Sequence, residues 1–174
     1  MFQELKASIH SFQAELSEVD EVAHLLLKGH LLLEEALSRI LDQHVFHREH
    51  LKACRLRFNE KVHLCRALCL RKHRLGEWDL VVAINQLRNE LAHNLQSAAR
   101  EKKVNRVKEL YFREAAGLEG LDDLKGQPDA VILFYACAHC AGFLASFEAD
   151  ARALRVMIHT MDRALHPSLP EFDL

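Results

Sequence analysis

The sequence predicts an all-α protein, an up-and-down bundle of five to six helices. Apolar residues recur at three- and four-residue steps along most of the chain, as they do on one face of a helix. Only 6 of the 174 residues are Gly and 3 are Pro, and aromatic residues make up 7%. A β-sandwich or barrel needs more turns and more aromatic or β-branched residues. The length suits one domain, so we expect residues 1–165 to form a single helical domain and residues 166–174 a short extended tail.

The first three helices are predicted from their periodicity and one start signal. Residues Phe2–Leu16 form the first, and Ser17 and Asp20 resemble the start of a second, longer helix. That helix carries an apolar stripe of Val22, Leu25, Leu26, Leu33, Leu37, Ile40 and Leu41. A third helix is expected over Arg48–Leu70, with a stripe of Leu51, Cys54, Phe58, Val62, Cys65 and Cys69.

The second half of the chain predicts two further helices and one long one. The fourth helix is expected over Glu77–Arg100, and a charged fifth one over Glu101–Ala116. Gly117, Gly120, Gly126 and Pro128 then mark a loop. The last helix, Asp129–Leu165, has its apolar stripe at Phe134, Cys137, Ala141, Leu144, Phe147, Ala151, Leu154, Ile158, Met161 and Leu165. Two prolines in the residues that follow end it.

Composition and charge exclude several classes of protein. A net charge of −2 excludes a strongly basic nucleic-acid coat and a disordered acidic tail. The most apolar stretches, Leu25–Leu33 and Ala130–Phe147, are interrupted before about 20 lipid-compatible positions accumulate, so we expect no membrane span. No apolar signal region follows the first charges, and 5 Cys is an odd count without framework spacing. These features predict reduced thiols and a cytoplasmic location.

The cysteines and histidines allow a metal site, but packing is the favoured interpretation. Cys137-Ala-His139-Cys140 and Cys65-x-x-x-Cys69 have spacings that could share a zinc ion. Most of these cysteines fall on apolar stripes, where free Cys behaves as a small hydrophobic residue; Cys140 lies off the stripe and is expected to be partly exposed. His24 and His30 are expected to be partly buried and hydrogen-bonded. The cluster of His44, His47 and His50 is expected at the surface.

The predicted fourth helix has two faces that both need cover. One is a narrow apolar stripe of Leu80, Ile84, Leu87, Leu91 and Leu95, which we expect to face the core. The other mixes apolar residues with hydrogen-bonding ones, namely Val81, Val82, Asn85, Arg88, Asn89, Ala92 and His93. A solvated face would carry Lys, Glu and Gln instead. We therefore expect a second subunit to cover it, in a homodimer.

Arg88, Asn89 and His93 are the candidate catalytic residues on that face. Asn89 and His93 are four residues apart and can touch, whereas Arg88 and His93 lie roughly 140° apart around an ideal helix. A neutral His can take the proton of a ribose 2′-hydroxyl, and a guanidinium can hold the phosphate and its developing charge. This chemistry cleaves RNA without a metal. A polar network that fixes the register of a dimer is the structural alternative.

The stretch Leu87-Arg88-Asn89-Glu90-Leu91-Ala92-His93-Asn94 resembles the R-N-x-x-x-H motif of HEPN domains, a helical family of RNase toxins and defence proteins. Gly29-His30-x3-Glu34-Glu35-x-Leu37 and Phe58-x2-Lys61-x2-Leu64-x2-Ala67 are similar to earlier helices of stand-alone HEPN-like proteins. The resemblance covers residues 20–100. It implies a dimer in which two motifs face a shared cleft, with Arg88 and His93 catalytic and Asn89 accompanying them.

One position departs from part of this family. Members paired with nucleotidyltransferase antitoxins often carry a Tyr two residues after the His, where this chain has Leu95. Other HEPN-like relatives, including the mannitol-repressor-like group, act as regulators or scaffolds. Regulation through a modified Tyr is therefore not expected here.

Charge is concentrated around the motif. From Lys61 to Lys108 there are eleven basic and four acidic residues, a net charge of +7, so the rest of the chain carries −9. A phosphate backbone would be attracted to this segment, where we expect RNA-binding residues at Arg71, Lys72, Arg74, Arg100, Lys102 and Lys103. Solvated helix ends would give the same pattern. Trp78 and Tyr111 are the only nearby aromatic residues with a polar handle for contacting bases.

The function predicted from the sequence is a metal-independent endoribonuclease of HEPN type, in a toxin–antitoxin or anti-phage setting. It would need no cofactor, and its partners would be RNA, a second copy bound through the Arg88–His93 helix, and an antitoxin or regulatory protein. The alternative is a noncatalytic HEPN-like regulator or scaffold. A bundle that binds metal through Cys and His is the third.

Overall fold

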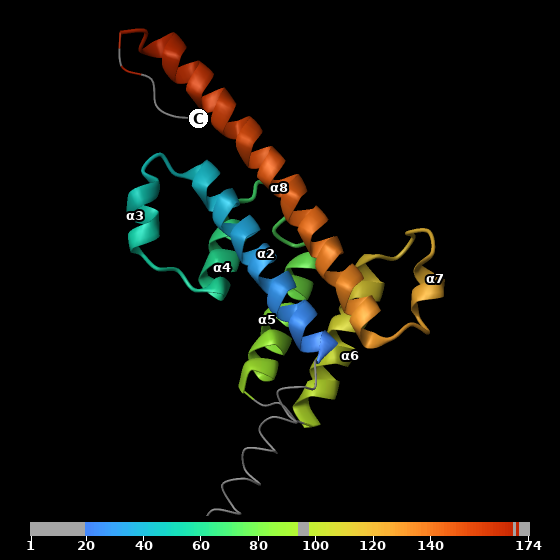
Figure 1. Ribbon diagram of the computed structural model, residues 1–174. Helices are drawn as coiled ribbons and strands as arrows, with labels where there is room; N and C mark the ends of the chain where they lie inside the picture. The colour runs from blue at the N-terminus through green and yellow to red at the C-terminus, as the bar shows by residue number, and fades with distance from the viewer. Residues whose placement is uncertain (1–19, 94–97, 169, 171–174) are drawn as a thin grey trace, which may run out of the picture.

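The computed structural model describes residues 20–93, 98–168 and 170 of the chain. These residues form seven helices (Figure 1): α2 (Glu21–His44), α3 (Arg48–Ala53), α4 (Phe58–Leu68), α5 (Glu77–His93), α6 (Ala98–Glu114), α7 (Leu121–Leu124) and α8 (Asp129–Leu165). They contain no strand, so the predicted all-α class is confirmed, although the helices outnumber the five to six expected. The predicted helix Phe2–Leu16 lies outside the described residues.

The long helices do not alternate in direction as an up-and-down bundle would. Contacts between α2 and α8 advance together along both helices, from Arg39 with Glu148 to the Val45 carbonyl with Arg155, so these helices run parallel. Between α2 and α4, the pairs Glu34–Lys61 and Leu37–Cys65 likewise advance together. The pictured path agrees: α5 alone among the long helices runs the opposite way (Figure 1). The up-and-down prediction is therefore wrong, because the short helices α3 and α7 lie in the connections that return the chain.

The predicted helix Arg48–Leu70 is two helices, α3 and α4. Between them Arg55 adopts a left-handed backbone conformation with φ of 49°, which cannot continue a right-handed helix. For a residue other than Gly this conformation costs free energy. The helix α4 then starts with the Arg57 amide donating to the Glu60 carboxylate at 2.7 Å. The break allows α4 to run parallel to α2, and it leaves Cys54 exposed instead of on a buried stripe.

The predicted fourth helix is also shorter than expected. Its last three residues, Ala98–Arg100, belong to α6, which turns back along α5. Glu90 near the end of α5 is ion-paired with Lys103, and Gly76 at the start of α5 lies against the Glu114 side chain at the end of α6. The two helices are therefore antiparallel neighbours. In contrast, α8 has the predicted bounds.

Helix α2 lies at the centre of the bundle and starts as the sequence predicts. The Asp20 carboxylate accepts a hydrogen bond from the Ala23 amide at 3.1 Å, which caps the helix, and Asp20 also pairs with Arg100 of α6. On its α8 side, Gly29 permits a close approach: a Cβ there would lie 2.8 Å from the Cys137 sulfur. The core also holds Trp78, whose ring meets Phe143 edge-on at 5.0 Å between centroids.

Helix α8 extends past the end of α2 (Figure 1). Its length and composition would allow it to cross a membrane, with a mean hydropathy of 1.8 in its most apolar window. The expectation that no segment meets this test is therefore wrong. A core helix of a soluble protein meets it too, and Ile132, Leu133 and Cys140 of α8 are fully buried in the bundle.

Candidate functional site

The apolar stripe of α5 faces the core as predicted. Leu80, Ile84 and Leu87 are fully buried, and Leu91 is nearly so. Leu95 lies outside the described residues. This stripe fixes the rotation of α5, so it also determines where the polar residues of the same helix point.

The other face of α5 is covered at its middle by the same chain. Val81 is fully buried and Asn85 is 5% exposed. The Asn85 amide group donates to the Asn59 side chain of α4 at 2.9 Å and accepts from His30 of α2 at 2.9 Å. A second subunit is therefore not needed to cover this part of the face. The burial of Val81 and Asn85 within the chain weakens the prediction of a dimer contact along α5.

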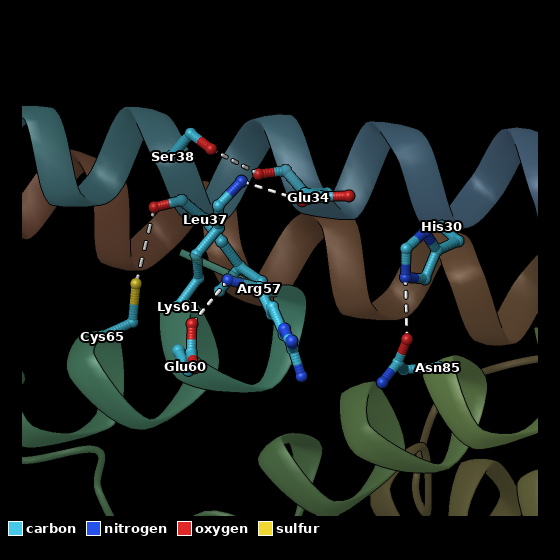
Figure 2. A network of polar contacts seen from close by, with 9 residues as sticks. All are labelled: His30, Glu34, Leu37, Ser38, Arg57, Glu60, Lys61, Cys65 and Asn85. Atoms are coloured by element: carbon cyan, nitrogen blue, oxygen red, sulfur yellow. Dashed lines mark hydrogen bonds and ion pairs between the residues drawn. The ribbon is translucent and has the colours of Figure 1, made fainter. Parts of the chain in front are cut away.

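His30, Asn85 and Asn59 form a buried polar chain between three helices (Figure 2 shows the link from His30 to Asn85). Because the Asn85 oxygen accepts, the hydrogen is on His30 Nε2. The ring stacks on Phe58 at 4.3 Å between centroids. His30 is thus the hydrogen-bonded, buried histidine that the sequence predicts, whereas His24 is exposed.

The pKa of His30 is lowered from its usual value. Burial is the largest cause, and the positive charges of Arg88 and Lys61 act in the same direction. The hydrogen bond to Asn85 and the Glu34 carboxylate oppose them. His30 is therefore a neutral side chain near Arg88, and its Nδ1 lone pair is buried without a hydrogen-bond donor among the described residues.

Arg88 and Asn89 lie one turn further along α5, where the cover ends. Arg88 is half-buried and Asn89 is exposed, and Arg88 Nη1 donates to Asn89 Oδ1 at 3.2 Å. Arg88 has no carboxylate partner within the described residues, and its buried Nε has no acceptor there. His93 is the last residue of α5, but its side chain lies outside the described part, so its distance to Arg88 is not defined.

The predicted RNA-binding residues fall into two separate groups. Arg71, Lys72 and Arg74 precede α5, whereas Arg100, Lys102 and Lys103 lie in the first turns of α6, beside the end of α5 that carries Arg88. A helix of the length of α5 separates its two ends by about 25 Å. Only the α6 group shares an end of the molecule with the motif.

Half of these six side chains already hold acidic partners. Lys72 pairs with Asp150 at 2.9 Å, Arg100 with Asp20, and Lys103 with Glu90. The other three, Arg71, Arg74 and Lys102, have no ion pair with these acidic residues within the described part of the chain. The positive charge that an RNA backbone would meet near Arg88 is therefore smaller than the sequence count suggests.

The two aromatic residues considered for base contacts are not accessible. Trp78 is fully buried, with its Nε1 donating to the Lys72 carbonyl at 2.9 Å, and Tyr111 is 3% exposed. Both belong to the core instead. Burial of their large apolar rings stabilises the core more than exposure of the indole N–H or the phenol O–H would.

Most of the cysteines pack in the core, but two differ from their predicted exposure. Cys140, expected to be partly exposed, is fully buried, whereas Cys54 is exposed. Burial raises the pKa of the Cys65 and Cys137 thiols to about 12, and that of Cys140 is raised as well, also chiefly by burial. No group of three or more His, Cys, Asp or Glu side chains within the described ranges is placed to hold a metal ion.

Sequence reasoning missed two features. Asn59, the partner of Asn85, has no signal in the sequence because its role depends on how α4 crosses α5. The exposed end of α8 did have a signal: its apolar stripe continues well beyond the length of any other predicted helix.

No protein-family model, curated protein or solved structure matches this chain. The residues and their geometry therefore carry the functional argument.

Proposed function

We propose that the chain is a metal-independent endoribonuclease of HEPN type, with Arg88, Asn89 and His93 as its catalytic residues. The observation that carries the proposal is Arg88 itself. Many basic side chains are ion-paired, but within residues 20–93, 98–168 and 170 Arg88 has no carboxylate partner and is held by a neutral amide, Asn89. A guanidinium so placed is free to bind a phosphate.

In this mechanism His93 accepts the proton of a ribose 2′-hydroxyl, and the 2′-oxygen attacks the adjacent phosphorus. The bond to the 5′-oxygen breaks, and that oxygen takes up a proton to become a 5′-hydroxyl. Arg88 stabilises the charge on the phosphate oxygens, and Asn89 orients the guanidinium. The products are a 2′,3′-cyclic phosphate and a 5′-hydroxyl end, with no metal or cofactor in any step.

The setting follows from the same resemblance and is proposed with it: a cytoplasmic toxin or anti-phage protein, restrained by an antitoxin or regulatory protein. Of the predicted RNA contacts, Lys103 is linked to the helix of the motif through its ion pair with Glu90. The contact of two copies through the Arg88–His93 helix stays a prediction. Of the residues of that face whose side chains the structure describes, Asn89 and Ala92 are exposed and could take part in it.

The test is cleavage of RNA by the purified chain in excess EDTA, with the ends of the products identified. We expect Arg88→Ala and His93→Ala each to reduce the rate at least about 100-fold, since acid–base and phosphate-stabilising groups contribute that much. Arg152→Ala, at an exposed arginine of α8, is the matched control and should keep the wild-type rate.

Intact RNA at high protein concentration would contradict the proposal and leave the noncatalytic regulator as the better function. Wild-type cleavage by Arg88→Ala and His93→Ala would show a contaminating nuclease, and an equal loss in Arg152→Ala would show that the loss is not specific to the motif. Cleavage that disappears in EDTA and returns with a divalent cation would also contradict it.

A further inference from the structure

The last turn of α5 carries a carboxylate where a helix disfavours one. Glu90 is the fourth residue from the end of α5, which ends at His93. The carbonyls of a last turn lack intrahelical partners and give it a partial negative charge, so the turn unwinds easily and a carboxylate there is destabilising. The Glu90 side chain is only 12% exposed, and burial adds to this cost. A cation must therefore offset its charge.

Lys103 provides that cation from α6. Its ammonium group forms an ion pair with the Glu90 carboxylate, so the end of α5 and the first turns of α6 lie side by side at one end of the bundle (Figure 1). The Lys103 side chain is 36% exposed, and water and salt screen such a partly buried pair less than one at the open surface. The pair therefore ties the end of α5 to α6.

The start of α6 is itself held by α2. Arg100, about one turn before Lys103, donates through Nη2 to Asp20 Oδ1 at 2.9 Å. Asp20 also caps α2, so its position is set by the central helix of the bundle. The position of Lys103 is thus fixed by the fold before any RNA binds.

We propose that Lys103 is a positioning residue for the cleavage reaction, acting through Glu90 to hold the last turns of α5. Those turns carry Arg88 and end at His93, the residues assigned to phosphate stabilisation and proton transfer. The inference rests on the proposed ribonuclease function and changes one part of it: Lys103 holds the helix and does not bind the RNA backbone.

The ion pair argues against a phosphate contact by Lys103. To reach a phosphate, its ammonium group would have to leave the largely buried Glu90 carboxylate. Leaving a buried charge without its partner is strongly destabilising. Lys102 is the better candidate for such a contact, because it is exposed and points about 100° away around α6.

The first test is steady-state cleavage of RNA by the full chain in EDTA. We expect Lys103→Met to lower kcat at least about 10-fold and to leave KM within about 2-fold, because a displaced catalytic group slows the chemical step. The salt dependence of RNA binding should stay as in the wild type. Lys102→Met is the comparison for a phosphate contact: KM should rise, and the slope of log Kd against log salt should fall by about one.

The decisive variant removes both charges of the pair. In Lys103→Met alone the Glu90 carboxylate keeps its charge in a largely buried place, whereas adding Glu90→Gln removes that charge. The double variant should therefore recover kcat at least about 3-fold over Lys103→Met. A change at Glu90 would not compensate for the loss of a lysine that binds phosphate. Lys108→Met, which breaks the 2.7 Å pair between α6 and Asp129 of α8, is the matched control and should keep the wild-type kcat.

Hydrogen exchange of the Leu91 and Ala92 amides tests the pair without RNA. Exchange should be faster than in the wild type for Lys103→Met, and the double variant should slow it again, since the pair holds the last turn of α5. Unchanged exchange in Lys103→Met, no recovery in the double variant, or a raised KM with a lower salt slope would each overturn the inference. A wild type that cleaves no RNA contradicts the proposed function instead, and the exchange rates then decide whether Lys103 holds α5.

Discussion

Two asparagines one turn apart on α5 have different roles, and this difference decides which polar residues are available for chemistry. Asn85 is buried and bonded on both sides by the chain itself, to His30 and Asn59. Asn89 is exposed and bonded to Arg88. From the sequence both belong to one polar face. In the structure the first holds three helices together, and only the second remains with Arg88 at the surface.

The replacement Asn85→Ala tests the structural role of the buried residue. We expect it to lower the free energy of unfolding by about 1–3 kcal/mol, because His30 Nε2 would lose its acceptor in a buried site. The measurement is equilibrium unfolding in urea. Asn89→Ala is the matched control on the same helix and should change stability by less than about 0.5 kcal/mol. Equal losses in the two variants would contradict the assignment.

At the scale of elements, the contact between α2 and α8 depends on one glycine, Gly29, and not on a second one, Gly142. Gly29 of α2 lies where any side chain would meet Cys137, whereas Gly142 of α8 has open space around its Cβ position. A parallel pair of helices this close requires a small residue at the crossing. The solvent-facing glycine has no such requirement.

The pair Gly29→Ala and Gly142→Ala should therefore change stability in opposite directions. The first should destabilise the fold by about 1–3 kcal/mol through overpacking against the Cys137 sulfur. The second should stabilise it by about 0.5–1 kcal/mol, because Ala is the better helix former. Thermal and urea unfolding measure both effects. Adding Cys137→Ala should restore part of the loss in Gly29→Ala, and no restoration would mean that the strain lies elsewhere.

At the scale of the whole molecule, stability should decline with falling pH in two separate windows. The unfolded chain protonates His30 near its usual pKa of about 6.5, but the folded chain resists because burial lowers that pKa. The unfolded state then binds more protons, so the free energy of unfolding falls as the pH drops below about 6.5. The pKa of Asp20 is also lowered: burial alone would raise it, but Arg100 and the Ala23 amide outweigh that effect. Its stabilisation is lost below about pH 4.

Unfolding in urea at a series of pH values checks this prediction. His30→Phe should flatten the decline between about pH 7 and pH 5 and leave the decline below pH 4 in place. His24→Phe, at an exposed position of the same helix, should keep the wild-type profile. An unchanged slope in His30→Phe would show that another group titrates in the upper window.

The sequence by itself determined the features that depend on neighbours along the chain. The bounds of α8, the Asp20 cap of α2 and the buried stripe of α5 all follow from local periodicity and capping, and the structure confirms them. The sequence also predicts that Asn89 and His93, four residues apart, can touch, but it does not predict the hydrogen bond that Arg88 Nη1 donates to Asn89, because adjacent helical positions point about 100° apart.

Only the tertiary structure decided which face is covered and by what. The break at Arg55, the parallel course of α2 and α4, and the burial of Asn85 by His30 and Asn59 depend on contacts between residues far apart in the sequence. Periodicity shows that a helix face needs cover, but it does not show which element provides it. That is why the middle of α5 proved to be covered by its own chain, while the apolar stripe of α8 continues into residues such as Met161 and Leu165, which are exposed in the part of the chain that the structure describes.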